Sequence, residues 1–406
     1  MRTGMNAFDG QVTFAEALYN GRDVVLLAGT GWGKTLAFVM ACFLNPDIVI
    51  IIVSPLNALE EDQARRFRRW GLTATAVNAN TLMKRPKLIQ EIEAGKWQIV
   101  ITSPENLLSP QHLKPALTKI GFAMKVKIVI DEAHCIALWG NDFRPAWGRI
   151  GEVHGYVSHR VPIGLASATA PRPMLTTMKR SVNIAEDKHV YINLGNFRPN
   201  LYWKAKVMEE RQSLSERVDF LVPENPTPAN FLPNECALVY VNSRRTGCEV
   251  LDAIRAKLPP ELHHTVEVYH ALRGPVSKAW ILERFFKNGI RILICTEAAG
   301  MGCDFPNVHL VVQYMATDSL ISWVQRAGRG GRDGKPCTCI LLVEPGVVKE
   351  KLSATVGNGD DEPGINEELE YSKKCDETLR QYILTDNCRW QFIDTYFGNP
   401  PHGRAF

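Results

Sequence analysis

The chain has 406 residues, of which 45% are hydrophobic and 22% are charged, and its formal net charge is +4 at pH 7. This is the composition of a globular protein with two or three domains, and no apolar run is long enough to cross a membrane. The small positive charge permits a nucleic-acid partner without indicating one. Because the N-terminus lacks a signal-peptide pattern, we expect an intracellular protein, nuclear in a eukaryote and cytoplasmic otherwise, whose ten cysteines stay reduced.

Ten apolar runs of strand length recur along the chain, in two blocks of five. The first block comprises residues 24–28, 48–53, 99–102, 128–130 and 163–166, and the second comprises residues 237–241, 266–269, 290–295, 308–314 and 338–343. Helix-like segments lie between these runs, among them residues 59–70, 246–257 and 277–286. Strands that alternate with helices predict the α/β class, with parallel sheets flanked by helices. Two blocks predict two such domains in tandem, with a seam near residues 196–203.

The pattern changes after Pro345. Residues 357–364 (GNGDDEPG) predict a polar loop without core-forming residues, and residues 367–397 predict a helix. The apolar face of that helix would comprise Leu369, Leu379, Tyr382, Ile383, Ile393 and Phe397. We therefore expect a separate, helical segment over residues 346–406.

A phosphate-binding loop is predicted directly after the first strand, where residues 28–35 read AGTGWGKT and precede a helix-like segment. Glycines let backbone N–H groups converge on phosphate oxygens at the helix N-terminus. Lys34 would reach the β- and γ-phosphates, and Thr35 would bind Mg²⁺. The nucleotide site is thus assigned to eight consecutive residues: Ala28, Gly29, Thr30, Gly31, Trp32, Gly33, Lys34 and Thr35. Ala28 stands at the first glycine position of the general pattern, and Trp32 takes a usually small position, where it would crowd the loop.

Two adjacent carboxylates, Asp131 and Glu132, follow the strand at residues 128–130. Ligands of open α/β sheets gather at the carboxyl ends of strands. One acid of such a pair can hold Mg²⁺ on a nucleotide while the other orients or deprotonates water. Together with residues 28–35, the pair predicts a nucleotide triphosphate site. Upstream, the amide of Gln11 could read an adenine edge, although a glutamine near the N-terminus is more often a surface residue.

Aromatic and charged residues are interleaved after these acids: Trp139, Asp142, Phe143, Arg144, Trp147 and Arg149. Such clustering is unusual for a loop, and we expect it to join the nucleotide site to a nucleic-acid strand. Farther along, Arg326, Arg329 and Arg332 are three residues apart, which predicts that they share one face of a helical turn. They suit either the transition-state charge of a phosphoryl group or a phosphate backbone, and residue type alone does not choose between these roles.

In order and spacing, these motifs resemble the RecQ family of superfamily-two DNA helicases over nearly the whole chain. The first half of the match contains Gln11, residues 28–35, residues 54–56, residues 102–105, the DEAH string at residues 131–134, and residues 167–170. The second half contains residues 197–200 (FRPN), residues 240–244, residues 269–271, residues 296–308 and residues 325–333. The most specific part of the resemblance is the aromatic segment at residues 139–145.

The resemblance implies two RecA-like domains, residues 1–200 and 201–345, that use ATP and Mg²⁺ to translocate 3′→5′ on single-stranded DNA and to separate tailed duplexes. The implied catalytic residues are Lys34, Asp131, Glu132, His134, Gln325, Arg329 and Arg332. Thr35 and Asp131 would hold Mg²⁺, while Gly302 and Asp304 would join Gln11 and residues 28–35 around the nucleotide. The implied DNA-binding or coupling residues are Ser54, Pro55, Thr102, Trp139, Asp142, Phe143, Arg144, Thr169, Asn242, Ser243, Arg244, His270 and Thr296.

Two features of the resemblance concern single residues. Arg326 stands where the family often has an acidic residue, so the resemblance implies no role for it. Near the end of the chain, Cys388, Arg389 and residues 396–398 resemble the start of the family's zinc-binding subdomain. Residues 346–406 would then be a truncated zinc-binding-like segment, and the sequence leaves open whether the chain is a fragment of a longer protein or a trimmed family member. One cysteine cannot hold zinc, and zinc is therefore not predicted.

Three alternatives stay open on the sequence. The first is an RNA helicase, because enzymes that act on RNA share the DEAH string. The second is an ATP-driven translocase or strand-annealing factor with weak unwinding, since no winged helix is predicted. The third is an inactive nucleic-acid-binding scaffold, against which Lys34, Asp131, Glu132 and Arg332 argue.

Overall fold

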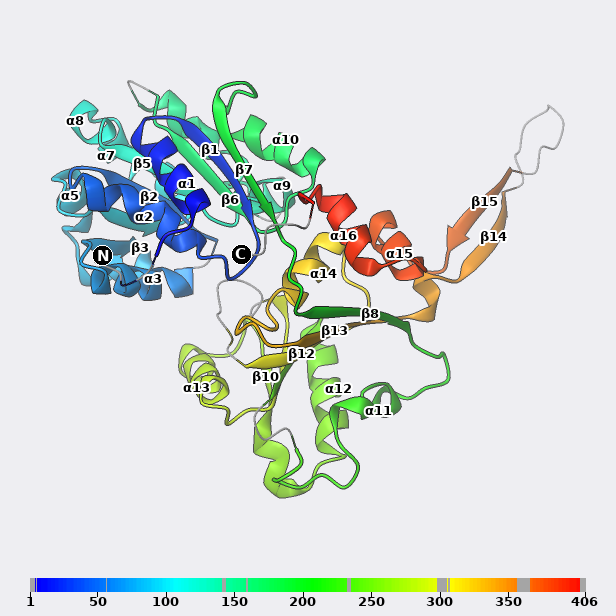
Figure 1. The fold of residues 1–406 in the computed structure, drawn as a ribbon. Helices are drawn as coiled ribbons and strands as arrows, with labels where there is room; N and C mark the ends of the chain where they lie inside the picture. Colours follow the sequence, from blue (N-terminus) through cyan, green and yellow to red (C-terminus); the bar gives the residue numbers. More distant parts are fainter. Residues whose placement is uncertain are drawn as a thin grey trace. The chain divides into compact units, whose positions relative to one another are not determined.

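In a computed structural model the chain is described at residues 4, 6–55, 57–140, 144–157, 160–231, 235–297, 305, 307–355 and 366–401. It forms two compact units, the first comprising Met1–Phe197 and Asp394–Phe406 and the second Arg198–Ile393 (Figure 1). The chain therefore passes between the units twice, once after Phe197 and once within its last helix, α16 (Arg389–Phe397).

Within the described residues, the first unit is built on a parallel sheet of seven strands, in the order β3-β4-β2-β5-β6-β1-β7. The strands are β1 (Asp23–Ala28), β2 (Val49–Val53), β3 (Ala74–Val77), β4 (Ile99–Thr102), β5 (Val126–Ile130), β6 (Ile163–Ser167) and β7 (His189–Gly195). The longer helices are α1 (Asp9–Tyr19), α2 (Lys34–Leu44), α3 (Asn57–Arg69) and α10 (Arg172–Ser181). The short helices are α4 (Ala79–Lys84), α5 (Leu88–Glu93), α6 (Pro104–Leu108), α7 (Lys114–Leu117), α8 (Ile120–Ala123), α9 (Cys135–Trp139) and the 3-10 helix η1 (Ile150–Gly155).

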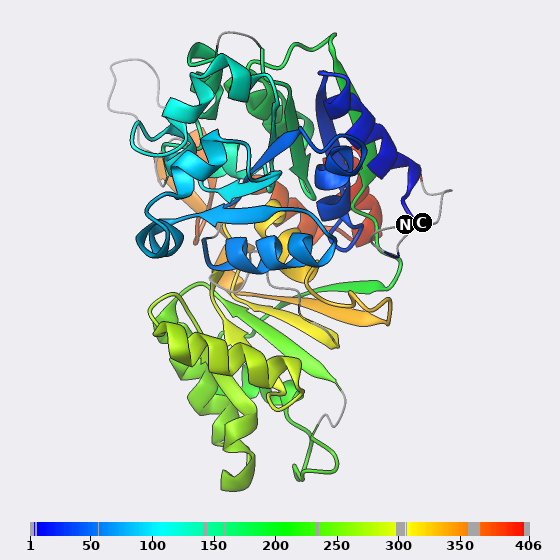
Figure 2. The ribbon, with the colours of Figure 1, turned by 90° about the vertical axis from the view of Figure 1, so that its left-hand side faces the viewer.

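Both faces of this sheet are buried. Phe14, Phe38 and Phe67, from α1, α2 and α3, pack in one core with alternate strand residues such as Leu26. The intervening strand residue Val25 is equally buried, and strand side chains alternate in direction, so it points to the opposite face. Figures 1 and 2 show the helices of this unit flanking the sheet. With both faces covered, the carboxyl edge of the sheet is where the polar side chains of a site can gather.

The second unit contains a parallel sheet of six strands, counted over the described ranges, in the order β10-β11-β9-β12-β13-β8. The strands are β8 (Leu201–Val207), β9 (Cys236–Val241), β10 (Val266–Tyr269), β11 (Ile292–Cys295), β12 (Val308–Tyr314) and β13 (Cys337–Val343). The helices are α11 (Leu214–Arg217), α12 (Arg244–Arg255), α13 (Pro275–Phe286), α14 (Leu320–Ala327) and α15 (Glu377–Leu384), with 3-10 turns η2 (Asp219–Leu221), η3 (Pro260–Thr265) and η5 (Pro345–Val347). An antiparallel pair, β14 (Glu350–Thr355) and β15 (Asn366–Tyr371), follows β13.

All ten predicted strands are present, and each sheet has further strands that the sequence pattern did not reveal. These are β3 and β7 in the first sheet and β8 in the second, and each lies at an edge of its sheet. An edge strand has no neighbour on one side. β8 accordingly alternates between covered and exposed residues over most of its length, and β7 is largely half-buried. β3 is buried, but its sequence, ATAV, is short and contains small side chains. Continuous apolar runs are typical of central parallel strands, so a search for such runs misses the edges.

The helix predicted over residues 367–397 is wrong in its first part. Residues Asn366–Tyr371 form β15, which pairs with β14 in a register that places Leu369 opposite Leu352. The sequence NEELEY places its apolar residues two apart, which suits a strand. Two helices, α15 and α16, then occupy the rest of the segment. The predicted loop at residues 357–364 lies outside the described residues.

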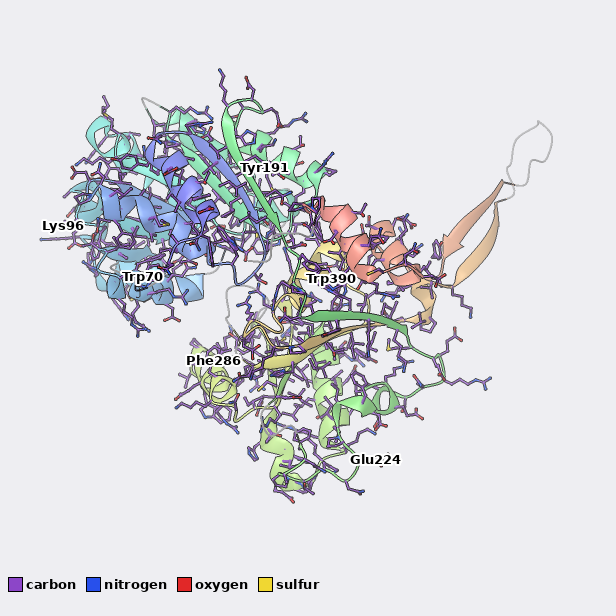
Figure 3. The ribbon with its side chains drawn as sticks, viewed as in Figure 1. Trp70, Lys96, Tyr191, Glu224, Phe286 and Trp390 are labelled. Atoms are coloured by element: carbon purple, nitrogen blue, oxygen red, sulfur yellow. The ribbon has the colours of Figure 1, made fainter. Side chains whose placement is uncertain are left out.

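A cluster of tryptophans attaches α15 and α16 to the second sheet. Trp203, on β8, makes edge-on contacts with Trp323 of α14 and Trp390 of α16, at centroid distances of 5.6 and 5.4 Å. The indole of Trp390 (Figure 3) donates a hydrogen bond of 3.1 Å to the Leu201 carbonyl. Trp323 donates one of 3.3 Å to the Tyr382 hydroxyl on α15. The start of α16 is therefore part of the core of the second unit.

Across the described ranges, none of the helices combines the length and the apolar character that a membrane crossing requires.

Candidate functional site

The loop between β1 and α2 has the conformation of a phosphate-binding loop. Gly31 and Gly33 have φ angles of +89° and +88°, in the left-handed region that glycine adopts without strain. The side-chain nitrogen of Lys34 donates to the carbonyls of Ala28, at 2.9 Å, and of Gly29, at 3.2 Å. The lysine is thus held over its own loop, at the N-terminus of an eleven-residue helix. Converging N–H groups and an ammonium are the donors that a phosphate chain requires.

Gln11, on α1, supports this loop, and Trp32, within the loop, anchors it in the core. Gln11 is 2% exposed, and its amide nitrogen donates to the carbonyls of Trp32, at 3.3 Å, and Gly33, at 3.1 Å. Its amide oxygen accepts from the backbone N–H of Phe8 at 3.0 Å. The Trp32 indole packs against Phe8, at a centroid distance of 6.1 Å, and belongs to the core of the unit. The bulk predicted to crowd the loop is therefore accommodated in the core.

Asp131 and Glu132 follow β5 directly, at the same carboxyl edge as the phosphate loop, because β1 and β5 both pair with β6 in parallel. The backbone N–H of Asp131 donates to the Val53 carbonyl at 3.0 Å, which fixes the start of the turn. Glu132 has a φ of +51°, a conformation that is rare and costly for a residue other than glycine. The fold therefore imposes the local backbone that presents these two acids.

Thr35 and Asp131 have the chemistry that a Mg²⁺ site needs beside a nucleotide. This cation usually binds one or two protein side chains and completes its shell with phosphate oxygens and water. Both residues are half-buried at the carboxyl edge of the first sheet. No group of three or more His, Cys, Asp or Glu side chains suited to a metal occurs among the described residues.

His134 connects the turn after β5 to the turn after β6. Its Nδ1 lies 3.0 Å from the Ser167 hydroxyl and 3.5 Å from a Glu132 carboxylate oxygen. The Ser167 hydroxyl in turn accepts from the Thr169 N–H at 3.1 Å and donates to the Thr169 carbonyl at 3.2 Å. His134, Ser167 and Thr169 are almost fully buried. These contacts hold the two turns together.

Arg144 joins three loops at the carboxyl edge of the first sheet. Its Nε and Nη2 donate to the two carboxylate oxygens of Glu105 at 2.9 and 2.6 Å, and its Nη1 donates to the Pro55 carbonyl at 2.7 Å. Burial alone would raise the pKa of Glu105, but hydrogen bonds from Arg144, the Glu105 backbone and Ser103 hold it below its usual value. Glu105 was not among the predicted site residues, although it belongs to the string 102–105.

Trp139 of the aromatic segment and Trp147, which follows the segment, both lie beside the same arginine. Trp139 and Trp147 meet edge-on at a centroid distance of 6.1 Å, and Arg144 lies 5.9 and 6.0 Å from their ring centroids. Trp147 is fully buried, whereas Trp139 is partly exposed. Asp142 and Phe143, predicted to contact DNA, lie outside the described residues.

Two other residues predicted to contact DNA in this unit are buried. Thr102 is fully buried, and its hydroxyl donates to the Val77 carbonyl at 3.3 Å. Ser54 is 5% exposed, and its N–H donates to the Thr102 carbonyl at 2.8 Å. In this arrangement both residues support the loops that Arg144 joins.

In the second unit, the predicted DNA-contacting residues follow β9, β10 and β11. Ser243 caps α12 by accepting from the Thr246 N–H, and Arg244 is exposed beside it. The pKa of His270 is lowered by partial burial and by the positive charges of Arg273, Arg244 and Lys278. Thr296 follows β11 and donates from its backbone to the Tyr269 carbonyl. Gly302 and Asp304 lie outside the described residues.

The prediction that three arginines share a helical face is wrong. Helix α14 ends at Ala327, and Gly331 has a φ of +55°, so only Arg326 lies on the helix and Arg329 and Arg332 lie in the loop beyond it. Gly328, the C-cap, still has helical backbone angles, and it is Gly331 whose left-handed conformation turns the chain away from the helical path. Gln325 is half-buried near the end of α14.

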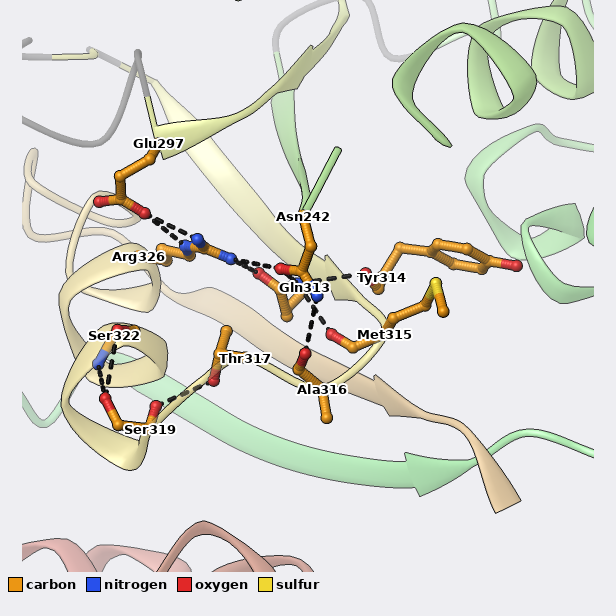
Figure 4. A network of polar contacts seen from close by, with 10 residues as sticks. All are labelled: Asn242, Glu297, Gln313, Tyr314, Met315, Ala316, Thr317, Ser319, Ser322 and Arg326. Atoms are coloured by element: carbon orange, nitrogen blue, oxygen red, sulfur yellow. Dashed lines mark hydrogen bonds and ion pairs between the residues drawn. The ribbon is translucent and has the colours of Figure 1, made fainter. Parts of the chain in front are cut away.

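Arg326 is the centre of a polar network, drawn in Figure 4. Its Nη1 donates to Gln313 Oε1 at 2.6 Å and to Asn242 Oδ1 at 3.1 Å, while its Nε and Nη2 donate to Glu297. Asn242 also donates to the Ala316 carbonyl at 2.7 Å. The network ties together the segments that follow β9, β11 and β12, which gives Arg326 a structural role inside the unit.

The loop after α14, residues 328–335, is held by the first residues of the second unit. Arg198 donates to the carbonyls of Gly328, at 3.0 Å, and Gly331, and Asn200 donates to those of Gly331 and Lys335, each at 2.7 Å. We call residues 328–335 the arginine loop, because they contain Arg329 and Arg332. Arg329 is 5% exposed.

Some residues of this site were missed by reasoning from the sequence, although signals for them exist. Gln313 is a polar residue within the apolar strand β12, and buried polar side chains require partners. Glu297 follows β11 as Asp131 follows β5. Arg198 and Asn200 belong to the FRPN string of the resemblance, but nothing local relates them to a loop 130 residues away.

Two models of protein families match the chain. The model described as DEAD/DEAH box helicase matches residues 8–177, and the one described as helicase conserved C-terminal domain matches residues 221–334. Among curated relatives, the probable ATP-dependent DNA helicase RecS of Bacillus subtilis is 29% identical over 338 residues, or 83% of this chain and 64% of that protein. The ATP-dependent DNA helicase RecQ of Synechocystis is 28% identical over 79% of this chain and 65% of its own length. The chain thus spans less than two thirds of either relative.

Solved structures share the fold. The helicase MrfA bound to DNA matches with a TM-score of 0.67 and 18% identity, over 84% of this chain and 49% of its own. Dbp5 of S. cerevisiae bound to RNA and ADP BeF3 matches with a TM-score of 0.59 and 16% identity, over 98% and 93% of the two chains. At these identities the likeness concerns the fold, which is that of two RecA-like α/β domains in tandem, as the sequence predicted.

Proposed function

We propose, from the premise that this chain belongs to the RecQ-type DEAD/DEAH box helicases, that it hydrolyses ATP to move along single-stranded DNA and to unwind duplex DNA. The observation that carries the proposal lies within the first unit. There the phosphate loop after β1 and the acids after β5 share the carboxyl edge of one sheet. His134 and Ser167 connect those acids to the turn after β6.

The chain's own residues supply most of the groups that phosphoryl transfer needs. Lys34 and the N–H groups at the start of α2 would bind the phosphates, with Thr35 and Asp131 holding Mg²⁺, which when bound offsets phosphate charge. Glu132 would orient or deprotonate the attacking water, and the 3.5 Å contact of its carboxylate with His134 supports this role. Arg329 and Arg332 would stabilise charge on the transferred group, as an arginine finger does.

DNA is the favoured substrate for two reasons. Relatives that match about four fifths of the chain are DNA helicases by name, and Trp139 offers a partly exposed indole on which a base could stack. The fold by itself does not choose, since a protein bound to RNA shares it. The 3′→5′ polarity and the preference for tailed duplexes are inferred from the resemblance to the RecQ family.

One experiment tests the proposal directly. ATP hydrolysis and strand separation are measured for the wild-type chain and for Lys34→Ala, on duplexes with 3′ or 5′ single-stranded tails and on matched RNA. We expect DNA-stimulated hydrolysis and unwinding of 3′-tailed DNA only, both lost in Lys34→Ala. Hydrolysis without strand separation would instead indicate a translocase, and stronger stimulation by RNA would indicate an RNA helicase. A wild-type chain without ATPase activity would refute the proposal.

A further inference from the structure

The segment in which the chain first passes from one unit to the other has contacts with a catalytic loop at each of its ends. We call residues 195–200 the crossing segment, with Gly195 to Phe197 in the first unit and Arg198 to Asn200 in the second. Its first part contacts the phosphate loop, and its last part contacts the arginine loop. Each contact lies within a single unit.

In the first unit, the crossing segment touches the start of the phosphate loop. The N–H of Gly29 donates to the Gly195 carbonyl at 2.9 Å. A Cβ on Gly29 would lie 3.3 Å from the Cα of Asn196, so the two backbones are in close contact. Asn196 is also bound by the side chain of Asn399, whose Nδ2 donates to Asn196 Oδ1 at 2.7 Å.

In the second unit, the crossing segment binds the backbone of the arginine loop. Arg198 and Asn200 donate to carbonyls of three loop residues, Gly328, Gly331 and Lys335. The Asn200 carbonyl also accepts from the Cys337 N–H at 2.8 Å, where β13 begins. These bonds fix the loop at both its beginning and its end.

Gly331 shows how closely this contact is fitted. Its φ is +55°, and a Cβ there would lie 2.6 Å from the Asn200 amide nitrogen and 2.9 Å from the Lys335 carbonyl oxygen. Burial and the neighbouring charge of Arg332 both lower the pKa of Arg198. A guanidinium stays protonated even so. Holding two like charges close together is unfavourable, and the carbonyl oxygens around Arg198 compensate for it.

We propose that Arg198 and Asn200 are positioning residues for Arg329 and Arg332, and that the crossing segment links the phosphate loop to the arginine loop. This inference rests on the proposed ATPase function, in which the two arginines stabilise the transition state. Arg198 and Asn200 do not touch the nucleotide in this scheme. They act by setting where the arginine loop lies within the second unit.

The test compares hydrolysis by Arg198→Ala and Asn200→Ala with hydrolysis by the wild-type chain. A displacement of about 1 Å in catalytic groups costs on the order of 10²-fold in rate, so we expect kcat to fall by about that factor in Arg198→Ala while the KM for ATP is unchanged. Arg198→Lys keeps the charge but cannot donate to two carbonyls as a planar fork does, and it should restore little activity. Full activity in Arg198→Lys would show that charge alone matters and would overturn the proposal.

A matched control exists in the same unit. Arg255 also binds two backbone carbonyls, those of His263 and Val266, at 3.2 and 2.8 Å. Arg255→Ala should lower the unfolding midpoint as Arg198→Ala does, yet leave kcat unchanged. An equal loss of kcat in both variants would reduce the role of Arg198 to general stability and overturn the proposal. If Arg198→Ala does not fold, Asn200→Ser, which perturbs packing less, is compared with Arg255→Ala in the same two quantities, kcat and the unfolding midpoint.

A variant cycle separates this inference from the proposed function. If Arg198 acts through Arg329 and Arg332, Arg198→Ala should have no further effect on kcat in a background that carries both Arg329→Ala and Arg332→Ala. A further fall in kcat on adding Arg198→Ala to that background would contradict the positioning role while leaving the ATPase assignment intact. Failure of the proposed function is a different result, because the wild-type chain itself would then not hydrolyse ATP.

Discussion

Two nitrogen atoms of Arg326, Nε and Nη2, donate to the same carboxylate oxygen of Glu297, at 3.0 and 2.7 Å. The arginine side chain is 8% exposed and the glutamate 47%. The arginine thus turns into the unit while Arg329 and Arg332 stand in the loop beyond. Spacing along the sequence made the three arginines equivalent, and the fold separates one from the other two.

The first prediction concerns the stability conferred by this pair. Arg326→Met would leave the buried amide oxygen of Gln313 without its donor and remove one of two donors to the Asn242 oxygen, so we expect the free energy of unfolding to fall by roughly 1–3 kcal/mol. Glu297→Ala should cost less, about 0.5–1 kcal/mol, because the carboxylate is half-exposed and solvent screens its charge. Urea unfolding followed by tryptophan fluorescence measures both. Lys287→Met is the control, because Lys287, at the end of α13, forms an exposed ion pair with Glu283. An equal loss of unfolding free energy in Lys287→Met would contradict the role of Arg326.

The second prediction concerns the link between His134 and Ser167. Ser167→Ala removes the 3.0 Å contact with Nδ1 of His134, so the carboxylate of Glu132 loses its indirect support. We expect kcat for ATP to fall roughly two- to twelvefold, the equivalent of one hydrogen bond of about 0.5–1.5 kcal/mol, with nucleotide binding unchanged. His154→Ala, which removes a contact with the Val182 carbonyl, should leave kcat as it is. Weaker nucleotide binding in Ser167→Ala would argue against a purely catalytic effect.

The third prediction concerns coupling through the aromatic segment. Trp139→Ala should retain ATP binding and basal hydrolysis but lose stimulation by single-stranded DNA, because Trp139 lies beside Arg144, which joins three loops of the sheet edge. Hydrolysis is measured with and without an oligonucleotide. Trp97 and Arg85 form another tryptophan–arginine pair in the same unit, with the guanidinium carbon 4.7 Å from the ring centroid. Trp97→Ala is the control, and it should leave the stimulation by DNA unchanged. Normal stimulation of the Trp139 variant would exclude a coupling role for this residue.

The fourth prediction concerns pH. Burial raises the pKa of Glu60 to about 7, against a hydrogen bond from Asn78 and the charge of Arg144, and with a smaller contribution in the same direction from Glu105. Between about pH 4.5, where an unfolded glutamate titrates, and pH 7, the folded state binds more protons than the unfolded state. Stability therefore falls as the pH rises through this window.

Glu60→Gln tests that sign, because an amide cannot ionise. We expect the variant to lose less stability than the wild type between pH 5 and pH 8, by about 3 kcal/mol in total, since a shift of one unit corresponds to about 1.4 kcal/mol. Denaturant unfolding at several pH values gives the slope. Parallel pH profiles for the two proteins would show that Glu60 does not titrate in this range.

The fifth prediction concerns the finger itself. Removing an arginine finger costs about 10³–10⁵ in rate, so Arg332→Ala should nearly abolish turnover without weakening ATP binding. A binding assay with a non-hydrolysable ATP analogue separates the two effects. Unchanged hydrolysis would remove Arg332 from the catalytic residues.

The sequence by itself determined the parts of this protein whose chemistry is local. The string at residues 28–35 and the acids Asp131 and Glu132 could be placed at strand ends because glycine, lysine and carboxylate side chains have few other reasons to follow an apolar run. The central strands were evident for a similar reason, since a strand buried on both faces is apolar throughout.

Tertiary structure decided the rest, because it depends on which distant segments meet. The edge strands β7 and β8 are half-polar and become strands only by pairing with β1 and β13. Arg326 could have faced a phosphate or a carboxylate, and the fold places it against Glu297. Arg198 and Asn200 lie 130 residues before the loop that they hold, and no local pattern relates the two. Hydrogen bonds between segments so far apart exist only once the sheet brings β8 beside β13, where Asn200 meets the arginine loop.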